Sequence, residues 1–178
     1  ASTVGITEFL PAVAGLLMQR EIDILDEIRS NPPEPYVAIF GGAKISDKIE
    51  VIETLLPRID HLVVGGAIAN TFLKARDFGI GQSEVEEKSL QSAHRIMQMA
   101  GKKLLLPVDV VIARRCEDAQ NTRTVYVRGI PEDWCIVDIG PDTIDMIIRL
   151  TSGARLVIWN GPLGIAEITS FARGTDTI

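Results

Sequence analysis

The chain has 178 residues, of which 46% are hydrophobic, and it carries a formal net charge of −6. A chain of this length can bury one sizeable core, and its composition does not indicate two full domains. The negative charge argues against a nucleic-acid partner, because the sequence has no basic stripe to neutralise a phosphate backbone. Two cysteines, Cys116 and Cys135, form neither a disulfide framework nor a CxxC metal spacing. We therefore expect a reducing, cytoplasmic compartment in which both thiols are inert.

The first predicted element is an apolar helix over residues 9–18, packed on protein. This segment follows Glu8 rather than a basic flank and is too short to span a bilayer, so we predict no membrane role. A proline-rich linker, SNPPEP, occupies residues 30–35. It divides the chain into a first segment, residues 1–35, and a second, residues 36–178.

From residue 36 onward, apolar runs alternate with amphipathic segments, as in βαβ units. We predict strands at 36–40, 61–65, 103–106, 108–112, 135–139 and 155–159, and helices near 44–57, 67–76, 84–101 and 141–152. The predicted fold is therefore α/β, a Rossmann-like parallel sheet with helices on both faces. Residues 122–129 are an exception, because apolar and polar side chains alternate there and indicate a short antiparallel excursion.

The most informative motif follows the first predicted strand. Residues 36–40 lead into GGAKISDK, residues 41–48, and then into an amphipathic segment. A helix that begins near Lys44 would present unpaired N–H groups and the positive end of its dipole, which suit a phosphate. Lys44 and Lys48 are four residues apart and would share a helix face. The alternative is a structural glycine turn with two solvated lysines.

A second turn of similar design follows the last predicted strand. Residues 155–159, RLVIW, are typical of a buried strand and run into NGPLG, residues 160–164, a turn that lets backbone approach a flat ligand. The Glu167 carboxylate follows and can accept hydrogen bonds from ribose hydroxyls, although an ordinary carboxylate in the first turn of a helix is the alternative. Both turns are expected at the carboxyl edge of the sheet, where ligands of open α/β sheets bind.

Five motifs in one order resemble the C-terminal, nucleotide-binding domain of the phosphoglycerate kinase family: GGAKISDK, VVGGAIANTFLKA, LLPVDVVIA, VDIGP and WNGPLG. The resemblance implies that residues 1–35 are an interdomain or hinge-helix segment and that residues 36–178 are the nucleotide-binding α/β domain. Members of the family are longer. They have an N-terminal domain that binds 3-phosphoglycerate and a later GGGD loop whose Asp holds magnesium, so we expect a truncated domain here.

The family activity is reversible phosphoryl transfer between 1,3-bisphosphoglycerate and ADP, which gives 3-phosphoglycerate and ATP in glycolysis. The resemblance implies that Lys44 is catalytic and contacts the transferring group, and that Lys48 contacts the phosphates nearer the adenosine. The other implied nucleotide contacts are backbone at Gly42 and Ala43, the base contacts Gly65 and Gly66, the adenosine pocket of Asn160, Pro162, Gly164 and Ile165, and the ribose contact Glu167.

Further expectations follow from the same resemblance. Magnesium would bind through the phosphates of ADP or ATP, with no metal ligand in this chain. The substrate 3-phosphoglycerate would bind only through the N-terminal domain, and the whole enzyme would be a cytoplasmic monomer. The isolated chain is expected to be inactive. In this family Asp109 and Asp138 belong to structural turns, so we predict capping and turn hydrogen bonds for them.

Two other functions are considered. The first is a nucleotide-binding module without chemistry of its own. The second is a dinucleotide-binding dehydrogenase domain. The chain contains no GxGxxG and no recognisable ribose acid some twenty residues beyond the first glycine turn, and it also lacks the Walker sequence GxxxxGK[ST]. The dehydrogenase interpretation is therefore the weaker one.

Overall fold

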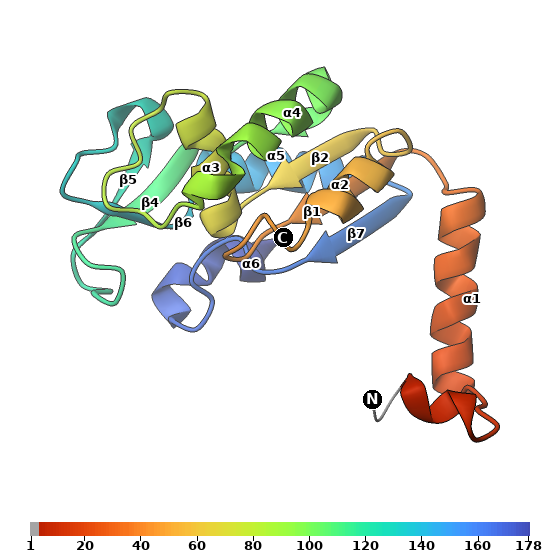
Figure 1. Cartoon of the computed structure of the whole chain (residues 1–178). Coiled ribbons are helices and arrows are strands. Elements are labelled where there is room, and N and C mark those ends of the chain that lie inside the picture. The colour runs from red at the N-terminus through yellow and green to blue at the C-terminus, as the bar shows by residue number, and fades with distance from the viewer. Residues whose placement is uncertain (1–3) are drawn as a thin grey trace. The chain divides into compact units, whose positions relative to one another are not determined.

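The computed structural model describes residues 4–178, and the chain separates into two compact units, Ala1–Pro33 and Glu34–Ile178. Residues 1–3 of the predicted hinge segment lie outside the described residues. The first unit contains a 3-10 turn, η1 (Gly5–Glu8), and the helix α1 (Leu16–Ser30), drawn in red and orange in Figure 1. The predicted helix over 9–18 is wrong for most of its length, because regular helix begins only at Leu16. Across residues 4–178, no helix has the length and apolar character needed to cross a membrane.

The second unit is built on a four-stranded parallel sheet with the order β3-β2-β1-β7. Its strands are β1 (Tyr36–Phe40), β2 (His61–Val64), β3 (Leu104–Leu105) and β7 (Leu156–Asn160). Every residue of β1 is buried, as expected for a central strand covered on both faces. The α/β prediction with a parallel sheet is confirmed.

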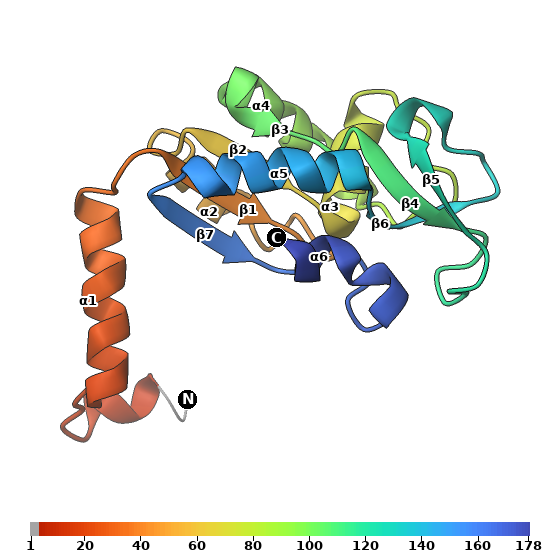
Figure 2. The same cartoon turned by 180° about the vertical axis from the view of Figure 1, so that it is seen from behind.

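Helices cover both faces of this sheet, so that in Figure 1 α2 lies in front of β1 while α5 lies behind, and Figure 2 shows the reverse. Val37 and Ile39 of β1 form one apolar cluster with Ile144 and Ile147 of α5. The alternation of side chains along β1 places the remaining strand residues on the other face. The helices are α2 (Ile49–Leu55), α3 (Gly66–Ala75), α4 (Leu90–Ala100), α5 (Pro141–Gly153) and α6 (Arg173–Thr177).

A second, antiparallel sheet has the order β5-β4-β6. Its strands are β4 (Asp109–Ala113), β5 (Thr122–Tyr126) and β6 (Cys135–Ile139). The predicted excursion over 122–129 is confirmed for β5, which pairs antiparallel with β4, and the chain then forms the 3-10 turn η4 (Val127–Gly129). However, the strands predicted at 108–112 and 135–139 belong to this sheet and not to the parallel one. A continuous apolar run marks a buried strand without specifying the direction of its neighbour, so sequence alone did not separate the two sheets.

The strand β7 lies at the edge of the parallel sheet, where it pairs with β1 alone among the described residues. Val157 and Trp159 are 39% and 36% exposed. The prediction of a buried strand at 155–159 is therefore wrong in its burial, because Val157 and Trp159 share a face of this edge strand that is left partly exposed.

Candidate functional site

Three turns meet at the carboxyl edge of the parallel sheet, after β1, β2 and β7. The N–H of Gly42 donates to the carbonyl of Pro162 at 2.7 Å, and the N–H of Gly66 donates to the carbonyl of Leu163 at 2.9 Å. Backbone hydrogen bonds thus join the turns that follow the three strands. The sequence prediction that the glycine turns lie at this edge is confirmed.

The closeness of these turns explains part of the glycine content. A Cβ atom on Gly41 would lie 2.0 Å from the carbonyl oxygen of Pro162. Gly66 has a φ of +59°, and a Cβ there would lie 2.7 Å from the nitrogen of Gly42. Both positions accept only glycine, because any side chain would collide with backbone. Contacts between the turns account for these two glycines without any ligand.

The segment 41–48 is a turn and not the start of a helix. The helix α2 begins at Ile49, with Lys48 in the capping position, so the predicted helix start near Lys44 and the shared helix face of the two lysines are both wrong. The side chain of Ile45 is fully buried and fixes the turn against the core, whereas Lys44 is exposed. Burial of an apolar side chain overrides the helical pattern of this segment.

Lys48 links two of the strand ends. Its ammonium donates to the carbonyl oxygen of Gly41 at 2.6 Å and lies 3.4 Å from that of Asn160. Burial lowers the pKa of Lys48 below its ordinary value, and the neighbouring Asp47 carboxylate partly opposes this shift. The positive charge is held where the ends of β1 and β7 meet.

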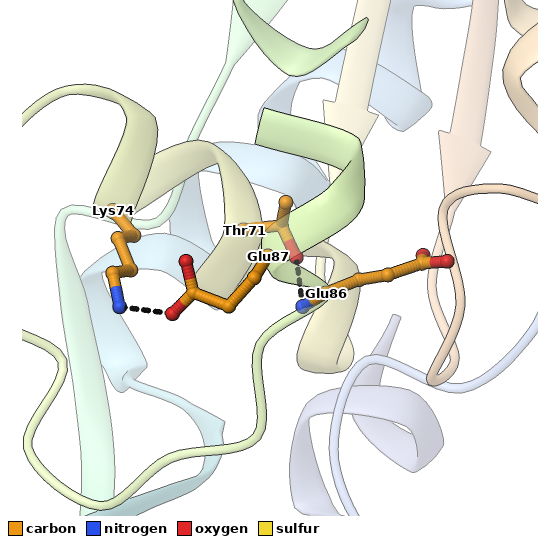
Figure 3. A network of polar contacts seen from close by, with 4 residues as sticks. All are labelled: Thr71, Lys74, Glu86 and Glu87. Atoms are coloured by element: carbon orange, nitrogen blue, oxygen red, sulfur yellow. Dashed lines mark hydrogen bonds and ion pairs between the residues drawn. The ribbon is translucent and has the colours of Figure 1, made fainter. Parts of the chain in front are cut away.

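A polar network ties the lysine-bearing turn to the segment between α3 and α4. The carboxylate of Glu86 accepts a hydrogen bond from the N–H of Ser46 at 3.0 Å, and the N–H of Glu86 donates to the hydroxyl of Thr71 at 3.2 Å. Figure 3 shows Glu86 extended toward the turn, beside the ion pair of Lys74 and Glu87. Slight burial acts to raise the pKa of Glu86, but hydrogen bonds, chiefly from Ser46, outweigh it and hold this pKa below its ordinary value.

A cavity of about 480 Å³ opens beside the three turns. Its walls come from β6 of the second sheet, from α3 and from segments that connect the strands and helices. It is lined by Gly42, Ala43, Gly66, Ala67, Asn70, Glu84, Cys116, Ile136, Val137, Asp138, Pro162, Leu163, Gly164, Ile165 and Glu167. The structure therefore brings together most of the predicted nucleotide contacts. Four predicted residues lie in the turns or at a strand end without lining the cavity: Lys44, Lys48, Gly65 and Asn160.

Glu167 lies in a turn before the short 3-10 helix η5 (Thr169–Phe171) and is exposed beside the cavity. The alternative of a carboxylate in the first turn of a helix is therefore wrong. The same turn is anchored by the N–H of Ile165, which donates to the carbonyl of Val137 at 2.9 Å. This bond joins the segment after β7 to β6 of the second sheet.

Sequence reasoning missed Asn70, which lies on α3 one turn after Gly66 and is 3% exposed. Its Nδ2 donates to the carbonyl of Glu84 at 3.1 Å, while its Oδ1 has no hydrogen-bond partner among the described residues. A buried acceptor without a partner is costly, and this residue lines the cavity. The i, i+4 spacing from Gly66 was the available sequence signal.

Asp109, at the start of β4, holds the first turn of α5. Its carboxylate accepts hydrogen bonds from the N–H groups of Asp142 and Thr143 at 3.1 and 2.8 Å, and from the Thr143 hydroxyl at 2.7 Å. These N–H groups have no partner within the helix, so an acceptor from another element satisfies them. The prediction of capping for Asp109 is confirmed.

Asp138, in β6, is also a structural acceptor and is buried. It accepts from the N–H of Ile139 at 2.8 Å and from that of Gly174, in α6, at 2.7 Å. Burial nevertheless raises the pKa of Asp138 to about 6, against these two hydrogen bonds, which lower it. The predicted turn and capping role is confirmed, although the helix that Asp138 holds is α6 and not the neighbouring α5.

Residues 4–178 contain no group of three or more His, Cys, Asp or Glu side chains placed to hold a metal ion. The polar features of the site are instead lysines, backbone N–H groups and the separate carboxylates described above.

Comparison with known proteins gives consistent results. Residues 1–178 match the family described as Phosphoglycerate kinase. The phosphoglycerate kinase of Rubrobacter xylanophilus is 52% identical over 178 residues, which are all of this chain and 45% of that protein. That of Chloroflexus aggregans is 48% identical over 181 residues and is likewise covered to 45%.

Solved structures agree with the sequence matches. The phosphoglycerate kinase of Coxiella burnetii superposes with a TM-score of 0.90 at 38% identity over 99% of this chain, and that of Pyrococcus horikoshii with 0.85 at 26% identity. The chain covers 46% of each of these proteins, and so spans less than half the length of the relatives that it matches. Fold, motifs and sequence identity together show that the chain belongs to the phosphoglycerate kinase family.

Proposed function

We propose that the chain is the nucleotide-binding part of a glycolytic phosphoglycerate kinase, which transfers a phosphoryl group reversibly between 1,3-bisphosphoglycerate and ADP. The observation that carries the proposal is the cavity of about 480 Å³ beside the turns after β1, β2 and β7 in a chain of this family. Its size falls within the range of small-molecule sites, and it lies where open α/β sheets bind ligands.

The nucleotide is proposed to occupy this cavity with its base and ribose against the turn after β7. Apolar surface from Pro162 and Ile165 suits a flat base, and Glu167 is exposed where it can accept from the ribose hydroxyls. Backbone at Gly42 and Ala43, together with Gly65, Gly66, Asn160 and Gly164, completes the proposed adenosine and phosphate contacts. The unpartnered Oδ1 of Asn70 supplies one further acceptor for a ligand N–H or O–H group.

The two lysines are proposed to act on the phosphates. An ammonium has three N–H donors, and Lys48 directs two of them at the carbonyl oxygens of Gly41 and Asn160, which leaves one for a phosphate oxygen. Lys44, exposed in the same turn, is proposed to contact the transferring group. Phosphoryl transfer depends mainly on positioning and on neutralising charge at phosphate oxygens. Lys48 is held at the end of β1 by its hydrogen bonds, and Lys44 adds a second positive charge in the same turn.

The remaining partners are proposed on the same basis. Magnesium is proposed to be held by the phosphates of the bound nucleotide. The substrate 3-phosphoglycerate binds to a part of the enzyme that matches the other half of the relatives' length. The whole enzyme is proposed to work as a cytoplasmic monomer.

The proposal is tested by calorimetric titration of residues 1–178 with Mg-ADP, using Glu167→Ala and, as a matched control, Glu50→Ala, which removes an exposed carboxylate from α2. The parent chain is expected to bind saturably. Loss of one hydrogen-bonded carboxylate should weaken binding by about five- to twentyfold in Glu167→Ala and leave Glu50→Ala unchanged. Absence of binding by the parent chain, or equal loss in both variants, would contradict the proposal.

A nucleotide-binding module without chemistry of its own is the second candidate, and the cavity beside the three turns would serve it equally. A coupled kinase assay tests whether the isolated chain has any chemistry of its own, and turnover would rule out this second candidate. Residues 1–178 alone are expected to show no turnover above the blank, because closure of two domains around the substrates excludes water in such kinases. Turnover by the isolated chain would contradict this expectation.

A further inference from the structure

The two cysteines of the chain lie against each other. Cys135 is the first residue of β6 and pairs across the antiparallel ladder with Ala113, the last residue of β4. Cys116 follows Ala113 by three positions, and the chain turns back there. As a result, the sulfur atoms of Cys116 and Cys135 are 2.7 Å apart, with the Cys116 thiol donating to the Cys135 sulfur.

The two thiols differ in access. Cys135 is 2% exposed and packs in an apolar cluster with Val137 and Phe171. Cys116 is partly exposed and lines the cavity. A reagent in solvent can therefore reach Cys116 directly, whereas Cys135 is reached through its neighbour.

We propose that Cys116 and Cys135 form a dithiol site that low-molecular-weight disulfides oxidise to an intramolecular disulfide. The Cys116 thiolate attacks one sulfur of the disulfide RSSR and forms a mixed disulfide, releasing one RS⁻. The Cys135 sulfur, after losing its proton, attacks the Cys116 sulfur and releases the second RS⁻. Two protein thiols and RSSR thus give a protein disulfide and two RSH, and excess dithiol reverses the reaction.

The geometry favours the second step over persistence of the mixed disulfide. A disulfide bond is about 2.05 Å long, so closure requires the two sulfur atoms to approach by roughly 0.65 Å from their present separation. Burial raises the pKa of the Cys135 thiol to about 12. Cys135 therefore remains protonated in the reduced protein, and attack begins at Cys116.

The bond would fix part of the cavity wall. Cys116 belongs to the segment between β4 and β5, and Ile165, another lining residue, packs against the cluster that contains Cys135. Closure joins that segment to β6. The oxidation itself is independent of the proposed kinase function; an effect on nucleotide binding rests on that function.

The test uses glutathione disulfide as the probe on residues 1–178 under native conditions, followed by an acid quench, alkylation of the unfolded protein and intact mass measurement. The expected product is a protein lighter by two hydrogen atoms, with both thiols protected from alkylation, and dithiothreitol should restore it. Peptide mapping should show residues 116 and 135 in one linked species. Alkylation of both thiols after the incubation, or accumulation of a stable glutathione adduct, would overturn the proposal.

Two variants identify the order of the steps. Cys135→Ser should accumulate the glutathione adduct on Cys116, whereas Cys116→Ser should remain largely unmodified because Cys135 is buried. Circular dichroism confirms that each variant is folded, and if the buried substitution unfolds the protein, Cys135→Ala replaces it. Rapid modification of a folded Cys116→Ser variant would contradict the assignment of Cys116 as the entry thiol. The mass result on the parent chain tests the disulfide even if no variant folds.

Discussion

The ammonium of Lys48 lies 2.6 Å from the carbonyl oxygen of Gly41 and also donates to that of Asn160, so that one side chain joins the end of β1 to the end of β7. We expect Lys48→Met to lower the free energy of unfolding by about 1–2 kcal/mol, because a charge-assisted hydrogen bond is lost while the aliphatic stem remains. Nucleotide affinity should fall as well. Urea unfolding and calorimetry measure the two effects.

Lys44→Met is the matched control, because Lys44 is exposed in the same turn. It should weaken nucleotide binding while changing the free energy of unfolding by less than about 0.5 kcal/mol. Equal stability of the Lys48→Met variant and the parent chain would show that the bridge between the strand ends does not contribute to stability.

Asp109 is expected to stabilise α5 through its contacts with Thr143 and Asp142. Asp109→Ala leaves these donors without their acceptor in a buried place and should cost about 2 kcal/mol or more. Asp145→Ala, which removes an exposed carboxylate from the same helix, should cost less than about 0.5 kcal/mol. Thermal or urea unfolding of both variants gives the comparison, and equal costs would argue against capping.

Asp138 should make stability depend on pH. Its pKa is raised by burial from 3.8 to about 6, so the folded protein binds this proton more tightly than the unfolded chain does. The resulting stabilisation is complete below the unfolded pKa and is lost as the pH rises through about 6. Between about pH 4.5 and pH 7, we expect the parent chain to lose about 2 kcal/mol relative to Asp138→Asn, which cannot titrate.

Urea unfolding at several pH values measures this difference. The Asp138→Asn substitution also changes hydrogen bonds at the site and therefore shifts the free energy of unfolding by an amount that does not depend on pH. The informative quantity is how the difference in free energy of unfolding between the parent chain and the variant changes with pH. A difference that stays constant across this range would show that Asp138 does not titrate as the structure indicates.

The exposed edge of β7 should promote association of residues 1–178. Val157 on this strand is 39% exposed, and an open strand edge can pair with another chain. Light scattering is expected to show mass increasing with concentration, and Val157→Lys should reduce this increase. Val51→Lys adds the same charge on α2, where the valine is 50% exposed, and should have little effect. A monodisperse monomer at all concentrations would contradict the expectation.

Local signals predicted much of this fold. The apolar runs that became β1, β2 and β6 are short, strongly hydrophobic and bounded by turn residues, and the glycine turns after β1 and β7 lie where the parallel sheet requires them. The start of α5 was also accessible, because Gly140 and Pro141 form a recognisable helix entry.

Other features depend on contacts between distant segments and were not accessible. The turn at 41–48 replaces a helical start because Ile45 is buried and Ser46 is bonded to Glu86, forty residues away. The spacing of Asn70 from Gly66 places both residues on one face of α3, but that face becomes part of the cavity wall only once α3 lies beside the turn after β7. The strands β4 and β6 pair antiparallel with each other and not with the parallel sheet, and a run of apolar residues does not specify which strand its neighbour will be.

The cavity wall combines Val137 of the antiparallel sheet with Pro162 from the turn that follows β7 of the parallel sheet. The cavity therefore exists only while both sheets are assembled, and a ligand that fills it adds its binding free energy to their junction. Amide hydrogen exchange should then slow at β6 when nucleotide binds, with less change at the mostly exposed β5. The nucleotide affinity and the exchange protection of β6 would then both report the free energy that couples ligand binding to the assembly of the two sheets.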